Sequence, residues 1–100
     1  MSAPGTTPGP WSVERVDYDL YGLDASFEVN AGRMTVVQTH MREIKREGEW
    51  LAVDEANCNL IAAAPDLYAA LDAMASEYGH LHSLSGDMAR AALSRARGEA

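Results

Sequence analysis

Hydrophobic and polar residues alternate over the first forty positions of the chain, which is the pattern of β-strands with one buried face. The alternation predicts strands over about residues 11–21, 25–30 and 34–40. Between the last two, Asn30-Ala31-Gly32-Arg33 is typical of a tight hairpin turn, because Asn and Gly tolerate positive φ angles. The three segments therefore predict an antiparallel meander.

The first of these strands changes the parity of its alternation part-way along. The hydrophobic positions are first Trp11 and Val13, and then Val16, Tyr18 and Leu20. A shift of one residue would move the second set to the opposite face, unless a β-bulge near residues 14 and 15 restored the register. We therefore expect a bulge there and all five hydrophobic side chains in the core.

The second half of the chain has helical periodicity and predicts helices over about residues 54–64, 65–78 and 85–97. Asp54 is the expected N-cap of the first helix. Pro65 should interrupt the apolar stripe, because proline removes a helical hydrogen bond and clashes with the preceding turn. The charged segment 42–49 contains Gly48 and predicts a loop, and residues 50–53 predict a short strand or docking segment.

These elements predict an α+β fold, in which an N-terminal antiparallel sheet of three or four strands is packed on one face by C-terminal helices. Residues 1–10 hold three of the four prolines and are expected to form a flexible arm. Residues 11–100 have the size of a single domain.

The charge balance favours a partner with a basic surface over nucleic acid. Fifteen acidic and eight basic residues give a net charge of −7. Segment 14–28 holds five acids and one base, and segment 54–87 holds six acids and no Lys or Arg. Such a surface would repel a polyanion, so no direct binding to nucleic acid is expected. The alternative is that the acidic surplus only keeps the protein soluble.

The acidic residues suggest a specific hypothesis, in which the protein imitates nucleic acid. Spaced carboxylates could compete for the basic nucleic-acid-binding surface of a host protein complex. The candidate acidic face consists of Asp17, Asp19, Asp24, Glu28, Asp66, Asp72 and Glu77.

A rival hypothesis is that the chain is a homo-oligomeric structural or regulatory protein. Its last helix has a thin apolar face, so it either packs weakly or contacts another chain, for example in a homodimer. The candidate self-association residues are Tyr68, Met74, Tyr78, Met88 and Leu93.

The sequence offers little material for catalysis or for a cofactor. Cys58 is the only cysteine and lies beside the apolar stripe, where a buried thiol is expected. His80 and His82 are two residues apart and could share a metal only with further ligands. We expect no enzyme, no cofactor and no metal site. With neither a signal peptide nor a long apolar run, we also expect a cytoplasmic protein without a membrane segment.

Two stretches resemble a group of small, mostly uncharacterised phage and prophage proteins. These are Thr7-Pro8-Gly9-Pro10-Trp11, similar to a TPGPW element, and DEANCNLIAAAPDLYAAL over residues 54–71, similar to an ANxxLIAAAPDLLxAL segment. Cys58, Asn59 and Tyr68 depart from the commoner pattern. The resemblance implies a phage accessory protein that acts in the cytoplasm of a bacterial host. Short acidic phage proteins include anti-CRISPR inhibitors, so it also implies inhibition of a host defence complex as one role.

Overall fold

The computed structural model describes residues 5–78 and 84–99, with Tyr78 described for its backbone alone. His80 and His82 lie outside this part of the chain. Where a single domain was expected over residues 11–100, the contacts divide the chain into two compact units. One unit, called the first unit here, comprises residues 7–64, and the second unit comprises the residues before Thr7 together with those from Pro65 onward.

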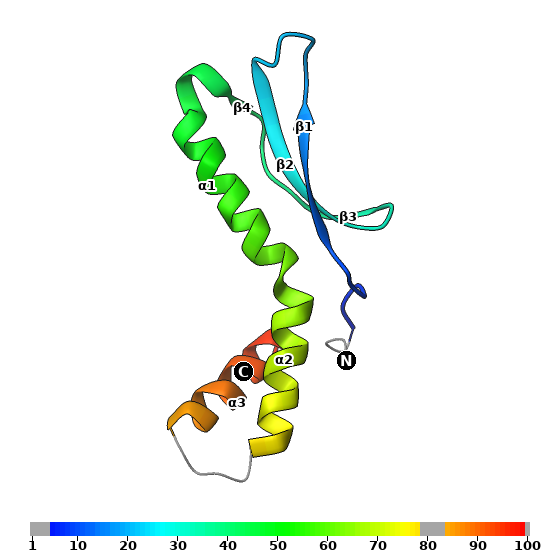
Figure 1. Ribbon diagram of the computed structural model, residues 1–100, viewed down its shortest axis with the longest axis vertical. Helices are drawn as coiled ribbons and strands as arrows, with labels where there is room; N and C mark the ends of the chain where they lie inside the picture. Colours follow the sequence, from blue (N-terminus) through cyan, green and yellow to red (C-terminus); the bar gives the residue numbers. More distant parts are fainter. Residues whose placement is uncertain (1–4, 79–83, 100) are drawn as a thin grey trace. The chain divides into compact units, whose positions relative to one another are not determined.

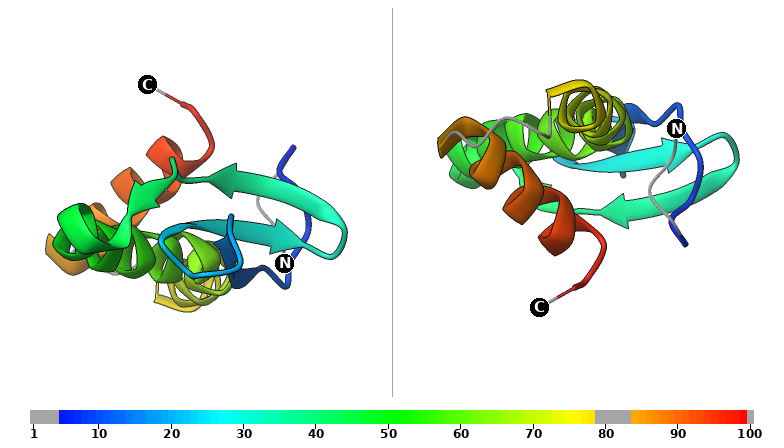
Figure 2. Two further views of the ribbon diagram at one scale, coloured as in Figure 1. Left: turned by 90° about the horizontal axis from the view of Figure 1, so that it is seen from above. Right: turned by 90° about the horizontal axis from the view of Figure 1, so that it is seen from below.

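The first unit is an antiparallel sheet followed by a long helix (Figure 1). Its elements are β1 (Ser12–Asp17), β2 (Asp24–Ala31), β3 (Met34–Gln38), β4 (Arg42–Glu43) and α1 (Ile44–Ala62). β2 is central, with β1 on one side and with both β3 and β4 pairing on the other. β2 and β3 appear side by side as antiparallel arrows in Figure 2. The predicted α+β class, with an antiparallel sheet and C-terminal helices, is confirmed.

The core of this unit lies between β2 and α1. Ala25, Phe27 and Val29 alternate along β2 and point to the side of α1, which contributes Leu51 and Cys58. Because successive side chains of a strand point to opposite faces, Ser26 and its even-numbered neighbours lie on the other face of the sheet. One face of the sheet is thus sealed by one helix.

The prediction of a β-bulge near residues 14 and 15 of the first strand is wrong. β1 pairs with β2 in an unbroken register from Ser12 opposite Asn30 to Asp17 opposite Ala25. Val16 therefore lies opposite Ser26, on the face away from the core, and the strand ends before the expected core residues Tyr18 and Leu20, which are exposed. The register shift occurs instead between Val29 and Asn30, where β2 pairs with β3.

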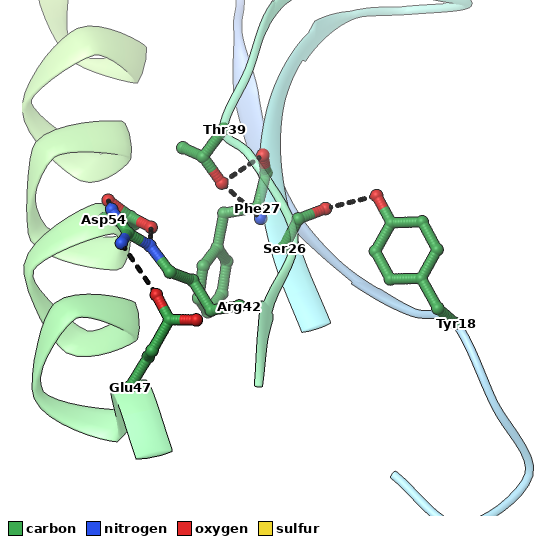
Figure 3. Close-up of polar contacts among 7 residues, drawn as sticks. All are labelled: Tyr18, Ser26, Phe27, Thr39, Arg42, Glu47 and Asp54. Atoms are coloured by element: carbon green, nitrogen blue, oxygen red, sulfur yellow. Dashed lines mark hydrogen bonds and ion pairs between the residues drawn. The ribbon is translucent and has the colours of Figure 1, made fainter. Parts of the chain in front are cut away.

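Thr39 bridges the gap between β3 and β4 along the edge of β2. Its N–H donates to the Phe27 carbonyl at 2.9 Å. Its hydroxyl accepts the Phe27 N–H at 2.9 Å and donates to the Phe27 carbonyl at 3.2 Å (Figure 3). The side chain thereby satisfies a main-chain donor of β2 where the ladder is interrupted. The interruption lets the chain turn into β4.

The helix α1 begins at Ile44, ten residues before the expected N-cap Asp54. Residues 44–49 are therefore helical and not a loop, and residues 50–53 are helical and not a strand. Gly48 does not end the helix, but the helix is distorted at the residue before it, Glu47, which has non-helical angles of φ −125° and ψ 24°. Asp54 lies inside the helix and faces the sheet, where it pairs with Arg42. Lys45, Arg46 and Glu47 are good helix formers, so Gly48 is the only strong helix breaker between Ile44 and Asp54.

Two helices, α2 (Ala64–Tyr78) and α3 (Leu84–Ala96), follow. The chain leaves α1 at Ala63, two residues before Pro65, which has no N–H to continue the helical hydrogen bonds. α3 ends at Ala96, and the φ of +76° at Gly98 lets its N–H bond to the Arg95 carbonyl and the Glu99 N–H bond to the Ser94 carbonyl.

Candidate protein-binding loop

The loop between β1 and β2, residues 18–23, holds two large side chains almost fully in solvent. Leu20 is 98% exposed and Tyr21 is 83% exposed. One Asp19 carboxylate oxygen accepts the N–H groups of Tyr21 at 3.1 Å and of Leu23 at 2.8 Å. Gly22 has a φ of +66°, which permits the tight turn between them. The sequence thus orders this loop locally while it directs Leu20 and Tyr21 outward.

The base of the loop is joined to the rest of the unit on both sides. The Tyr18 N–H donates to the Asp24 carbonyl at 3.2 Å, and the Ile44 N–H donates to the Leu23 carbonyl at 2.9 Å. The Tyr18 hydroxyl lies 2.8 Å from the hydroxyl of buried Ser26 (Figure 3). These contacts fix the ends of the loop against β2 and the start of α1.

Arg42 anchors the start of α1 beside this loop. Its Nε donates to Asp54 Oδ2 at 2.9 Å and its Nη1 donates to Glu47 Oε2 at 3.0 Å, as Figure 3 shows. The guanidinium also lies 5.9 Å from the centre of the Trp50 ring. The hydrogen bonds to Asp54 and then Glu47 raise the pKa of Arg42, and the bond to Arg42 lowers the pKa of Glu47. The cluster joins β4 to α1 and is structural.

Three residues of the predicted acidic face lie in or next to the loop. Asp17 is the last residue of β1, Asp19 is in the loop, and Asp24 is the first residue of β2. Asp17 accepts a hydrogen bond from Arg15 Nε at 3.1 Å, with both side chains about half exposed. The fourth, Glu28, accepts the side-chain N–H of Asn30 at 3.1 Å. The acidic residues therefore flank an apolar tip.

The other three residues of the predicted acidic face belong to α2, in the second unit. Asp66 and Glu77 are exposed. Asp72 is largely buried and accepts a hydrogen bond from Arg97 Nη2 at 3.2 Å. Two of the seven predicted residues, Asp17 and Asp72, are thus paired with arginines. Four of the seven belong to the first unit and three to the second.

The predicted self-association residues all belong to α2 and α3 of the second unit, and the side chain of Tyr78 lies outside the described part of the chain. Met74 and Met88 are exposed, whereas Leu93 is buried inside the unit, and the self-association of these residues stays a prediction. The Tyr68 hydroxyl accepts a hydrogen bond from Arg97 Nε at 2.6 Å, and the Tyr68 ring lies 5.7 Å from the same guanidinium. This hydrogen bond raises the pKa of Arg97. Leu93 and Tyr68 serve the internal packing of the second unit.

The remaining candidate chemistry is limited. Cys58 is fully buried, and burial raises the pKa of its thiol, which disfavours the reactive thiolate. Within residues 5–78 and 84–99, no group of three or more His, Cys, Asp or Glu side chains is arranged to hold a metal ion. No helix in the same part of the chain is both long and apolar enough to cross a membrane.

Comparison with known families agrees with the resemblance noted in the sequence. The profile of the family of Salmonella phage P22 protein Y8K6 matches residues 1–100. The chain belongs to this family. The prediction that the chain belongs to a family of small phage proteins is therefore confirmed. Neither a curated protein nor a solved structure matches this Y8K6 family member.

The alternation of hydrophobic residues does not predict the exposed loop of this Y8K6 family protein, because it extends the first strand to residue 21. Tyr18 and Leu20 continue the apparent alternation of β1, which predicts them in the core. The useful signal was local: an Asp followed three residues later by a Gly, which is typical of a side-chain-stabilised turn. That signal ends the strand at Asp17 and exposes the apolar residues that follow.

Proposed function

We propose that this Y8K6 family protein is a phage accessory protein that acts inside the host cell by stoichiometric binding to a host protein, without enzymatic activity. The observation that supports the proposal is the exposure of Leu20 and Tyr21 on a loop ordered by Asp19. Large apolar and aromatic side chains are typical centres of binding energy when a partner desolvates them. A loop that is ordered before binding loses less conformational entropy on association.

The charges around the loop favour a particular kind of partner. Segment 14–28 carries five acids and one base, and Asp17 and Asp24 stand at the two ends of the loop. We therefore propose that the partner presents an apolar pocket for Leu20 and Tyr21, with Lys and Arg side chains around its rim. Complementary rim charges increase the association rate, and this contribution weakens with salt.

The partner can be found and tested through the loop itself. A photo-crosslinking amino acid at position 21 should form a crosslinked product in host lysate, whereas the same group at position 88, an exposed methionine in the other unit, should not. The recovered partner is then purified for affinity measurements. We expect Leu20→Ala and Tyr21→Ala each to weaken binding by about tenfold or more, and Met88→Ala to leave it unchanged.

The affinity series can also contradict the proposal. If both loop variants bind the purified partner as tightly as the parent protein, the loop is not the contact surface. Circular dichroism should show that the variants are folded, since both side chains are almost entirely in solvent. A dissociation constant that does not increase with salt would contradict the proposed basic rim.

A second candidate is an acidic inhibitor that competes with nucleic acid for a host defence complex, in the manner of anti-CRISPR proteins. The net charge of −7 favours it, as do Asp66 and Glu77, which are exposed and form no salt bridge with an arginine in the described part of the chain. In this case Asp66→Asn with Glu77→Gln should weaken inhibition, whereas loop variants should not. A measurement of phage plating on an immune host, with and without expression of each variant, separates the two candidates.

A further inference from the structure

The face of the sheet that points away from α1 holds a buried hydrogen-bond acceptor without a donor. Asn30 of β2 is 7% exposed, and its Nδ2 donates to Glu28 Oε1 at 3.1 Å. Its Oδ1 is closed to solvent and accepts no hydrogen bond within residues 5–78 and 84–99. Such an acceptor lowers stability, because it has lost its hydrogen bond to water without gaining another.

Two carboxylates lie beside this amide on the same face of the sheet. Glu14 of β1 is directly opposite Glu28 of β2, so the two side chains start about 5 Å apart. Like charges in directly opposite positions destabilise an antiparallel pair. In the part of the chain that the structure describes, Glu14 forms no ion pair or side-chain hydrogen bond, and the Glu28 carboxylate bonds only to Asn30. We call Glu14, Glu28 and Asn30 the carboxylate–amide cluster.

We propose that the carboxylate–amide cluster binds the guanidinium group of an arginine on the partner protein. The inference rests on the proposed function and identifies one cation of the basic rim. Every free group of the cluster is a hydrogen-bond acceptor: the Glu14 carboxylate, the second Glu28 oxygen and Asn30 Oδ1. The occupant therefore has to supply a positive charge and donors alone, as guanidinium and ammonium groups do.

The spacing of the acceptors favours guanidinium over ammonium. Glu14 and Glu28 lie across two strands, and the Cα of Asn30 is roughly 7 Å further along β2 at about 3.4 Å per residue. A guanidinium group is planar and directs five N–H groups outward, so it can donate to several separated acceptors at once. An ammonium group is a compact point charge. Guanidinium is also more weakly hydrated, so it loses less free energy on entering a partly buried site.

The cluster is placed to act together with the β1–β2 loop. Glu14 is three residues before Asp17, where β1 ends, so it lies roughly 10 Å along the strand from the loop. A standard protein interface covers about 800 Å² of each partner, which is wide enough to include both. Glu14 is exposed and Glu28 is half-buried, so both side chains can change rotamer to admit the guanidinium group.

An NMR titration of the isotope-labelled full chain with N-acetyl-arginine amide tests the cluster without the partner. The Asn30 side-chain amide and the carboxyl carbons of Glu14 and Glu28 should shift and saturate, with a dissociation constant in the millimolar range. N-acetyl-lysine amide should bind at least about threefold more weakly. Glu14→Gln should weaken arginine binding at least about fivefold. Glu55→Gln, an equal loss of charge at an exposed site of α1, is the matched control and should bind as the parent does.

Three results of this titration would overturn the inference. Shifts that do not saturate, or equal weakening by Glu14→Gln and Glu55→Gln, would show that arginine responds only to the net charge of the protein. Equal affinity for the arginine and lysine amides would exclude recognition of the guanidinium group.

Urea unfolding of the free chain separates a binding role of Glu14 from a structural one. Because Glu14 faces a like charge, Glu14→Gln should raise the unfolding midpoint while it weakens binding to the purified partner by about tenfold. A lower midpoint would assign Glu14 to the fold and contradict the inference. A failed arginine titration leaves the proposed loop function intact if Leu20→Ala still weakens partner binding. An arginine-binding chain whose loop variants bind the partner normally would contradict the loop function alone.

Discussion

Two leucines of α1 test which face of the helix packs against the sheet and stabilises the fold. Leu51 is 7% exposed and packs in the core against β2, whereas Leu60 is 66% exposed. Replacing a buried leucine by alanine removes its transfer free energy and leaves a cavity, which together cost about 3 kcal/mol. At Leu60 most of the side chain is already in water, so alanine should cost no more than about 0.5 kcal/mol. Leucine and alanine are both good helix formers, so helix propensity does not confuse the comparison.

Urea unfolding followed by far-UV circular dichroism measures the difference. With a slope of about 1.5 kcal/mol per molar urea, Leu51→Ala should lower the unfolding midpoint by about 2 M, and Leu60→Ala should leave it almost unchanged. Low protein concentration keeps any self-association from stabilising the parent protein. Equal losses at the two positions, or a larger loss at Leu60, would refute the assignment of the buried face.

Three further predictions concern single groups of the first unit. Cys58 should react with thiol reagents at least about a hundredfold more slowly in the native protein than in urea, because burial raises the pKa of its thiol and excludes the reagent. Comparable rates of labelling in the two conditions would contradict its burial. The folded-state pKa of Glu47 is lowered by Arg42, so its contribution to stability is present above the unfolded pKa of about 4.5 and is lost as pH falls through the lower folded value. Urea melts at a series of acidic pH values should show a smaller loss for Glu47→Gln than for the parent, and identical losses would count against the ion pair. Gly22→Ala should destabilise the protein by about 1 kcal/mol, because the φ of Gly22 is positive. Gly48→Ala, in the helix with open space around it, should be neutral or stabilising by up to about 1 kcal/mol. Thermal melts that reverse this order would contradict the loop geometry.

Much of the sheet follows from local patterns in the chain. The alternation of Ala25, Phe27 and Val29 with polar residues defines the buried face of β2, because side chains of a strand alternate by geometry alone. The turn at Gly32, with its φ of +60°, and the β-branched residues after it define the hairpin to β3. These features depend on neighbouring residues, so they can be inferred without knowledge of distant contacts. The family resemblance likewise rests on short stretches of sequence.

Other features depend on pairs of residues that are distant along the chain. The ion pairs of Arg42 with Asp54 and Glu47 join β4 to α1, and only folding brings the buried Asp54 carboxylate into contact with its cation. The candidate functional surfaces were likewise set by tertiary structure. The same apolar residue type is buried at Leu51 and exposed at Leu60, and periodicity alone does not state which stripe faces the sheet. The sequence by itself determined the class of the fold and its hairpin, because local sterics and alternation suffice for them. Tertiary structure decided which carboxylates are free, which apolar side chains are displayed and where α1 begins, because those outcomes depend on which surfaces meet.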